Sequence, residues 1–134
     1  MSKIDSRIAR EICKWYKAWR TERVGGRVYR RFEWMQESGR YTLFGSGRDD
    51  GFVPSANIAH AIEALKNLPD GFAWTFGKRA SDFAPKRKFC LIWDANDMYL
   101  AETTGEHSAE IICRALLDKR VLKAVRKARK DVQK

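Results

Sequence analysis

The sequence is poor in the residues that build disulfide frameworks and metal sites. Of its 134 residues, three are cysteines and two are histidines. Cys13, Cys90 and Cys113 are odd in number and far apart, so they predict neither a disulfide framework nor a CxxC pair. This pattern favours a reducing, cytoplasmic setting. No apolar run approaches the ~18 residues that a membrane helix needs, so no membrane partner is expected.

A recognisable catalytic set is also missing. His60 and His107 have no second ligand at the spacing of a zinc site. The segment Gly45–Gly47 is not followed by the Lys and Ser/Thr that complete a phosphate-binding loop of the NTPase type. We therefore expect a protein that is not an enzyme and that uses no metal and no cofactor.

Charge, by contrast, is plentiful and unevenly placed. The net charge is +10, which indicates polyanionic partners. Residues 1–31 carry +7, residues 32–118 carry −4 and residues 119–134 carry +7. Because the middle is not basic, a polyanion site should combine the first helix, the first strand and the last helix. If these elements do not meet, the charge is a solubilising surface.

The first half of the chain predicts a helix, a hairpin and a second helix. Apolar residues at helical spacing predict a first helix that ends before the Gly25–Gly26 pair; they are Ile4, Ile8, Ile12, Trp15 and Trp19. Residues 27–35 and 41–44 then alternate as the two strands of a hairpin. A second helix begins near Pro54–Ser55 and ends before the turn at 69–71.

The second half predicts three strands and a long helix. Residues 72–77 form a strand, and residues 89–93 and 98–102 form a hairpin. A helix of about 25 residues begins near Ser108, and its basic end should project, pack on another chain or fray. The fold class is α+β: an antiparallel sheet of about four to five strands packed with helices, an α/β/α-like sandwich, with a long C-terminal helix. Residues 1–118 form one domain, and residues 119–134 are a basic extension of the last helix.

The remaining indication of function is a set of residues suited to binding phosphates and bases. Arginine forks and aromatic faces suit phosphates and bases, and both occur around the first predicted strand and in the basic loop at 78–88. The alternative is an edge strand whose charge prevents aggregation. The candidate ligand-binding residues are Arg27, Tyr29, Arg30, Arg31, Phe83, Arg87, His107 and Arg114. The candidate polyanion-binding residues are Arg120, Lys123, Arg126, Lys127, Arg129 and Lys130.

The order of elements and two short runs resemble a known family. The runs are Pro54–Ala61, which opens a helix, and Ala109–Leu117 (AEIICRALL), which follows Ala101-Glu102-Thr103. They are similar to the phage ABA sandwich domain. This resemblance implies a sheet between helices, a small phage or prophage accessory protein in the cytoplasm of a bacterial host, and no catalytic residues.

Two functions follow from that resemblance by analogy. The first is an anti-defence sponge that sequesters a nucleotide immune signal, of the cyclic nucleotide or ADP-ribose type, as a homo-oligomer joined through the last helices. The alternative is an anti-CRISPR-like inhibitor that binds a host defence protein, or a nucleic-acid-binding module that uses the basic N- and C-terminal helices. Salt-dependent binding to DNA or RNA distinguishes the second from the first.

Overall fold

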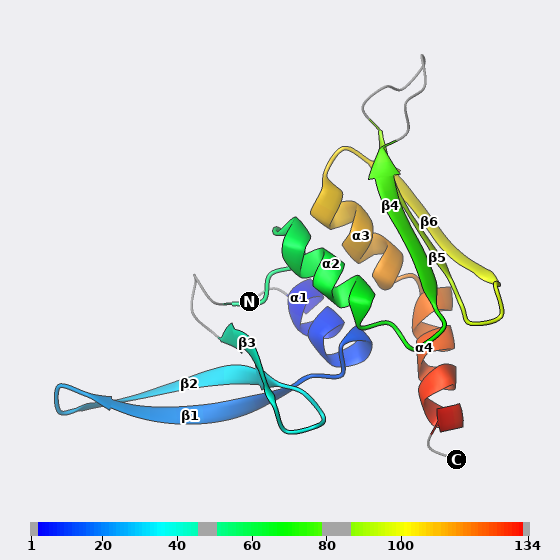
Figure 1. Ribbon diagram of the computed structural model, residues 1–134. Coiled ribbons are helices and arrows are strands. Elements are labelled where there is room, and N and C mark those ends of the chain that lie inside the picture. Colours follow the sequence, from blue (N-terminus) through cyan, green and yellow to red (C-terminus); the bar gives the residue numbers. More distant parts are fainter. Residues whose placement is uncertain (1–2, 46–50, 79–86, 133–134) are drawn as a thin grey trace.

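The computed structural model describes residues 3–45, 51–78 and 87–132. Its strands form two separate three-stranded antiparallel sheets, ordered β1-β2-β3 and β4-β5-β6. The α+β class is therefore confirmed, and the number of strands is close to the expected one. The expectation of a single sheet is wrong. The first sheet extends away from the body that the second sheet and the helices form (Figure 1).

The first helix is much shorter than its apolar spacing predicts. Helix α1 (Lys3–Arg7) continues as one π-helical segment, η1 (Ile8–Ile12), whose end is closed by hydrogen bonds from Cys13 N–H to the Ile8 carbonyl at 3.1 Å and from Trp15 N–H to the Ala9 carbonyl at 2.8 Å. Lys14 has a φ of +58°, a left-handed conformation that ends the helix. The expected helix through Trp19 is wrong, and residues 16–24 form a strand instead.

Strands β1 (Tyr16–Val24) and β2 (Arg27–Met35) form a long hairpin. Gly25 and Gly26 have φ values of +59° and +78°, the geometry of the tight two-residue turn that suits twisted strands. The glycine pair thus joins two strands rather than separating a helix from a strand. The predicted strand at 27–35 is confirmed, and so is its pairing with β3 (Tyr41–Gly45).

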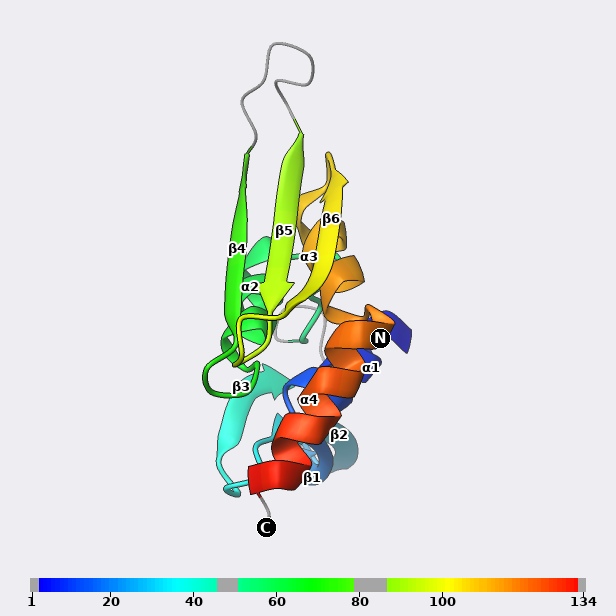
Figure 2. The ribbon, with the colours of Figure 1, turned by 90° about the vertical axis from the view of Figure 1, so that its right-hand side faces the viewer.

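The rest of the fold follows the predicted order of elements. Helix α2 (Ile58–Lys66) begins at Asn57, whose side chain accepts hydrogen bonds from the N–H groups of Ala59 and His60. Strand β4 (Ala73–Lys78) pairs with β5 (Lys88–Trp93), which pairs with β6 (Tyr99–Gly105) in the predicted hairpin. Both α2 and helix α3 (Ser108–Leu116) lie on one face of this sheet (Figures 1 and 2).

The C-terminal region is two helices rather than one. Helix α3 ends at Leu116, and α4 (Lys119–Val132) begins after Asp118, whose carboxylate accepts a hydrogen bond of 2.8 Å from the N–H of Arg120. This capping interaction starts a new helix and changes the chain direction. Helix α4 packs back on the body, with Val121, Leu122 and Val125 in the core. The expectation that its basic end projects or frays is therefore wrong for the described residues, and packing on another chain stays a prediction.

Candidate functional site

The most prominent surface feature is the hairpin formed by residues 16–35, which we call the arm. It projects from the body as a two-stranded ribbon (Figure 1), and β3 pairs only with its base, at Glu33 and Met35. The arm carries six basic residues and two acidic residues. The basic residues are Lys17, Arg20, Arg23, Arg27, Arg30 and Arg31.

The strand register divides the side chains of the arm between two faces. Residues that pair across an antiparallel ribbon lie on the same face, and the faces alternate along each strand. The first, which we call the aromatic face, consists of Lys17, Trp19, Thr21, Arg23, Val28, Arg30, Phe32 and Trp34. The second, the paired face, consists of Tyr16, Ala18, Arg20, Glu22, Val24, Arg27, Tyr29, Arg31, Glu33 and Met35.

Two cations contact rings on the aromatic face. Lys17 Nζ lies 4.6 Å from the ring centroid of Phe32 and 5.7 Å from that of Trp34. Arg30 Cζ lies 5.4 Å from the ring centroid of Trp19. The rings contact one another edge to face, Trp19 with Phe32 at 5.8 Å and Phe32 with Trp34 at 5.6 Å between centroids. Attraction between a cation and a ring face holds each pair together.

On the paired face, carboxylates pair with two of the three arginines. Arg20 Nη1 lies 2.9 Å from Glu33 Oε1, and Arg31 Nη2 lies 3.3 Å from Glu22 and 3.4 Å from Glu33. The hydrogen bond to Glu33 raises the pKa of Arg20, and this guanidinium also covers the ring of Tyr41. The aromatic face has three cations and no carboxylate, whereas the paired face has three cations and two carboxylates. The positive charge available to a partner is therefore concentrated on the aromatic face.

The eight ligand-binding candidates are spread over separate parts of the molecule. Arg27, Tyr29 and Arg31 lie on the paired face of the arm, and Arg30 lies on its aromatic face. Arg87, His107 and Arg114 lie at or beside the second sheet and α3, away from the arm (Figure 1). Phe83 lies outside the described residues. Exposed Arg87 comes just before β5.

His107 and Arg114 line two neighbouring clefts. His107 occupies the N-cap position of α3 without a side-chain capping bond, and it lines a cleft of about 480 Å³. Arg114 is on the exposed side of α3, as its position on the helix predicts, and lines a cleft of about 340 Å³. Ser55 and Glu110 line both clefts. The arm residues line neither cleft, so the described candidates do not form one nucleotide pocket.

The six basic candidates on α4 have different surroundings. Arg129 is half-buried and donates to the carbonyls of Glu11, at 2.5 Å, and Ile12, so it caps the end of η1. Arg126 pairs with the Glu11 carboxylate at 2.5 Å, and Arg120 pairs with Asp118 at 3.6 Å. The remaining three form an exposed stripe on the outer side of the helix. They are Lys123, Lys127 and Lys130.

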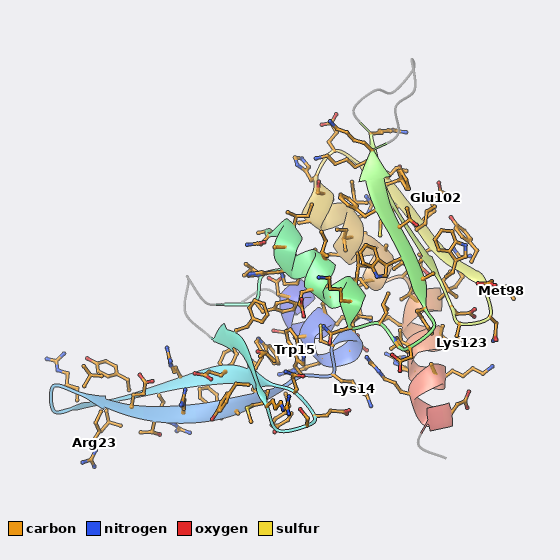
Figure 3. The ribbon with its side chains drawn as sticks, in the orientation of Figure 1. Lys14, Trp15, Arg23, Met98, Glu102 and Lys123 are labelled. Atoms are coloured by element: carbon orange, nitrogen blue, oxygen red, sulfur yellow. The ribbon has the colours of Figure 1, made fainter. Side chains whose placement is uncertain are left out.

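The two basic surfaces lie apart. Figure 3 shows Arg23 near the tip of the arm and Lys123 on the opposite side of the molecule. The first helix does meet α4, through Glu11, but the expected site that combines both basic ends on one surface is not formed.

The three cysteine thiols and the imidazole of His60 lie in environments that support the fold. All three cysteines are buried. Burial raises the pKa of Cys90 and Cys113 to about 12, with smaller contributions from Asp5 and Cys90 at Cys113, so these thiols remain protonated at neutral pH. His60 Nδ1 accepts a hydrogen bond of 3.0 Å from the N–H of Val53. Among the described residues, no three His, Cys, Asp or Glu side chains lie close enough together to hold a metal ion.

Sequence reasoning found half of the arm and missed the rest. Arg27 to Arg31 are on β2, but Lys17 and Trp19 were expected on a helix, and Phe32 and Trp34 were assigned only to a strand. The Gly25–Gly26 pair between two runs rich in aromatic and basic residues is the signal that could have revealed the partner strand.

No family model, curated protein or solved structure matches the chain. The similarity to the phage ABA sandwich domain stays a prediction. Within the described ranges, none of the helices is both long enough and apolar enough to cross a lipid bilayer.

Proposed function

We propose that the protein binds nucleic acid through the aromatic face of the arm. The observation that carries this proposal is the contact between cations and rings on a face without a carboxylate. It develops the second function expected from the sequence, with one change: the basic N-terminal element is a hairpin rather than a helix. The nucleotide sponge, the protein-level inhibitor and the phage anti-defence context remain predictions.

The chemistry of the aromatic face suits a polyanion that also carries flat rings. Lys17, Arg23 and Arg30 can contact successive phosphates, and each contact releases a counterion from the nucleic acid. Arginine provides a planar fork for phosphate oxygens, and the neighbouring rings provide surfaces for bases. A ribbon with neither face covered along most of its length can reach a partner without rearrangement of the body.

The exposed stripe on α4 supplies a second, weaker electrostatic contribution. Its three lysines add to the positive potential of a molecule with a net charge of +10. The stripe has no aromatic side chain within it. We therefore assign it long-range attraction of the polyanion rather than recognition.

The test is a salt titration of binding by fluorescence anisotropy, between about 50 and 200 mM salt. The variant Lys17→Gln/Arg23→Gln/Arg30→Gln removes the cations of the aromatic face. If each contacts one phosphate, the slope of log K against log [salt] decreases by about 2 to 3.

A matched control removes the same charge from the other face. The variant Arg20→Gln/Arg27→Gln/Arg31→Gln lowers the net charge equally, and we expect it to change the slope much less. Equal effects of the two triple variants, or no binding of any nucleic acid by the wild-type protein, would contradict the proposal.

A further inference from the structure

We infer that the arm recognises unpaired bases, and that Trp19 is the surface on which a base stacks; this inference rests on the proposed function. The ligand class is single-stranded nucleic acid, DNA or RNA, rather than a duplex. Two features of the aromatic face lead to it, the exposure of Trp19 and the contacts that hold its ring, together with the stacking of bases on one another in a duplex.

Trp19 is 62% exposed, although it lies in the middle of a strand. Trp34, at the base of the same face, is fully buried, and Phe32 between them is partly buried against the core. Burial thus decreases from the body outward along one row of rings. Trp19 is the ring of this row that a ligand can reach, and a π-face in water is a stacking surface for any base.

The ring of Trp19 is already held in place. Arg30 lies over it at 5.4 Å, and Phe32 meets it at an interplanar angle of 73°. A side chain that is ordered before binding loses less conformational entropy when a ligand stacks on it. Arg30 also places a guanidinium beside the stacking surface, where it can bind the phosphate of the stacked nucleotide.

The stacking surface of the arm favours unpaired bases over a duplex. In the major groove, arginine or lysine reads guanine, and asparagine or glutamine reads adenine. Residues 16–35 contain neither asparagine nor glutamine, so the arm lacks the side chains that read adenine. Bases in a duplex also stack on one another, so that their faces are not available to Trp19. Rings combined with cations instead match the chemistry of proteins that bind single strands with little sequence preference.

Equilibrium binding to matched nucleic acids tests this inference. The ligands are a labelled single-stranded DNA of about 12 nucleotides, a single-stranded RNA of the same sequence, and the corresponding duplex DNA. We expect at least one single strand to bind more tightly than the duplex at the same salt concentration. Trp19→Leu should weaken that binding about 5- to 150-fold, the range for loss of one stacked base, with the salt slope nearly unchanged.

Two further variants separate stacking from folding. Trp19→Phe keeps an aromatic surface at the same position and should recover part of the affinity that Trp19→Leu loses. Tyr29→Leu removes a ring of similar exposure, 50%, from the paired face and should bind like the wild type.

Failure of the stacking inference and failure of the proposed function give different results. Tighter binding of the duplex, or wild-type affinity in Trp19→Leu, would overturn the stacking inference, while salt-dependent binding would leave the proposed function standing. Equal losses in Trp19→Leu and Trp19→Phe would overturn it as well. Absence of binding to all three ligands would overturn both.

Discussion

At the scale of the residue, His60 is a side chain of a catalytic type that is part of the packing instead. Its ring lies 4.8 Å from that of Phe44 and 5.7 Å from that of Phe52, between centroids. Its Nδ1 is occupied as an acceptor by the N–H of Val53. A protonated imidazole cannot accept that hydrogen bond, so this environment requires the neutral form.

The same environment predicts a pH dependence of stability. Burial, only partly opposed by the charge of Asp5, holds the pKa of His60 below its ordinary value of 6.5. Below about pH 6.5 the unfolded chain takes up a proton that the folded protein resists. The stability that His60 contributes is therefore fully present above that pH and declines as the pH falls toward the folded pKa.

Thermal unfolding followed by circular dichroism measures this effect. The Tm of the wild-type protein should fall between about pH 7.5 and pH 5.5, and the Tm of His60→Gln should fall less over the same interval, because glutamine does not titrate. Since Gln can also accept a hydrogen bond, the variant tests protonation rather than loss of the contact. Parallel pH dependences for the two proteins would show that His60 has no part in it.

At the scale of the element, the arm depends on its turn. A two-stranded hairpin is marginally stable by itself, and β3 supports only the base of this one. Gly25 and Gly26 both adopt positive φ angles that L-residues with a Cβ rarely tolerate. Among the described residues, no atom beyond the adjacent residues lies within 4 Å of a Cβ added at either position, so the backbone conformation requires glycine there.

Substitutions at the turn should therefore differ in effect according to how well the new residue tolerates a positive φ. Gly26→Val should destabilise the arm by about 1–2 kcal/mol, the cost of forcing a left-handed conformation on a residue with a Cβ. Gly25→Asn should be tolerated, because an Asn-Gly pair favours this turn. Amide hydrogen exchange in β1 and β2 is the measurement: we expect faster exchange in Gly26→Val and wild-type rates in Gly25→Asn. Equal exchange in both variants would contradict the role of the turn.

The elements differ in how well the sequence predicts them. Strand β2 and the β5–β6 hairpin are found where the sequence predicts them, because these runs are rich in aromatic and β-branched residues and are bounded by turn residues. Strand β1 was not predicted, because Ile8, Ile12 and Trp15 continue a helical spacing into it, and pairing with β2 outweighs that local pattern. The break between α3 and α4 was missed because Asp118, whose side chain caps the new helix, lies within a continuous helical pattern.

The candidate site was only partly predictable, because the two faces of the arm depend on the pairing of β1 with β2. Arg27 to Arg31 could be recognised as an unusual basic strand, but the face on which each side chain lies depends on the register with β1. Without that register, Tyr29 and Arg31 could not be distinguished from Arg30. The pairing of Glu22 and Glu33 with arginines depends on the same register. Composition alone therefore does not identify which face has the larger net positive charge.

At the scale of the whole molecule, the net charge of +10 is distributed over two separate surfaces. The arm and α4 both adjoin the short helical unit α1–η1: β1 follows it in the chain, and Arg126 and Arg129 of α4 bind Glu11. From there they extend in different directions (Figures 1 and 3). A single polyanion chain would have to span the molecule to contact both, so recognition by the arm alone is the simpler account.

The most direct test of this account is an NMR titration of the full-length protein with a single-stranded oligonucleotide. The account predicts that the indole N–H of Trp19 and the amides of β1 and β2 shift on binding. The indoles of Trp74 and Trp93, which lie in the second sheet, serve as internal references and should keep their positions. Shifts centred on the second sheet or on α4, with the arm unaffected, would contradict the claim that the aromatic face of the arm is the binding surface.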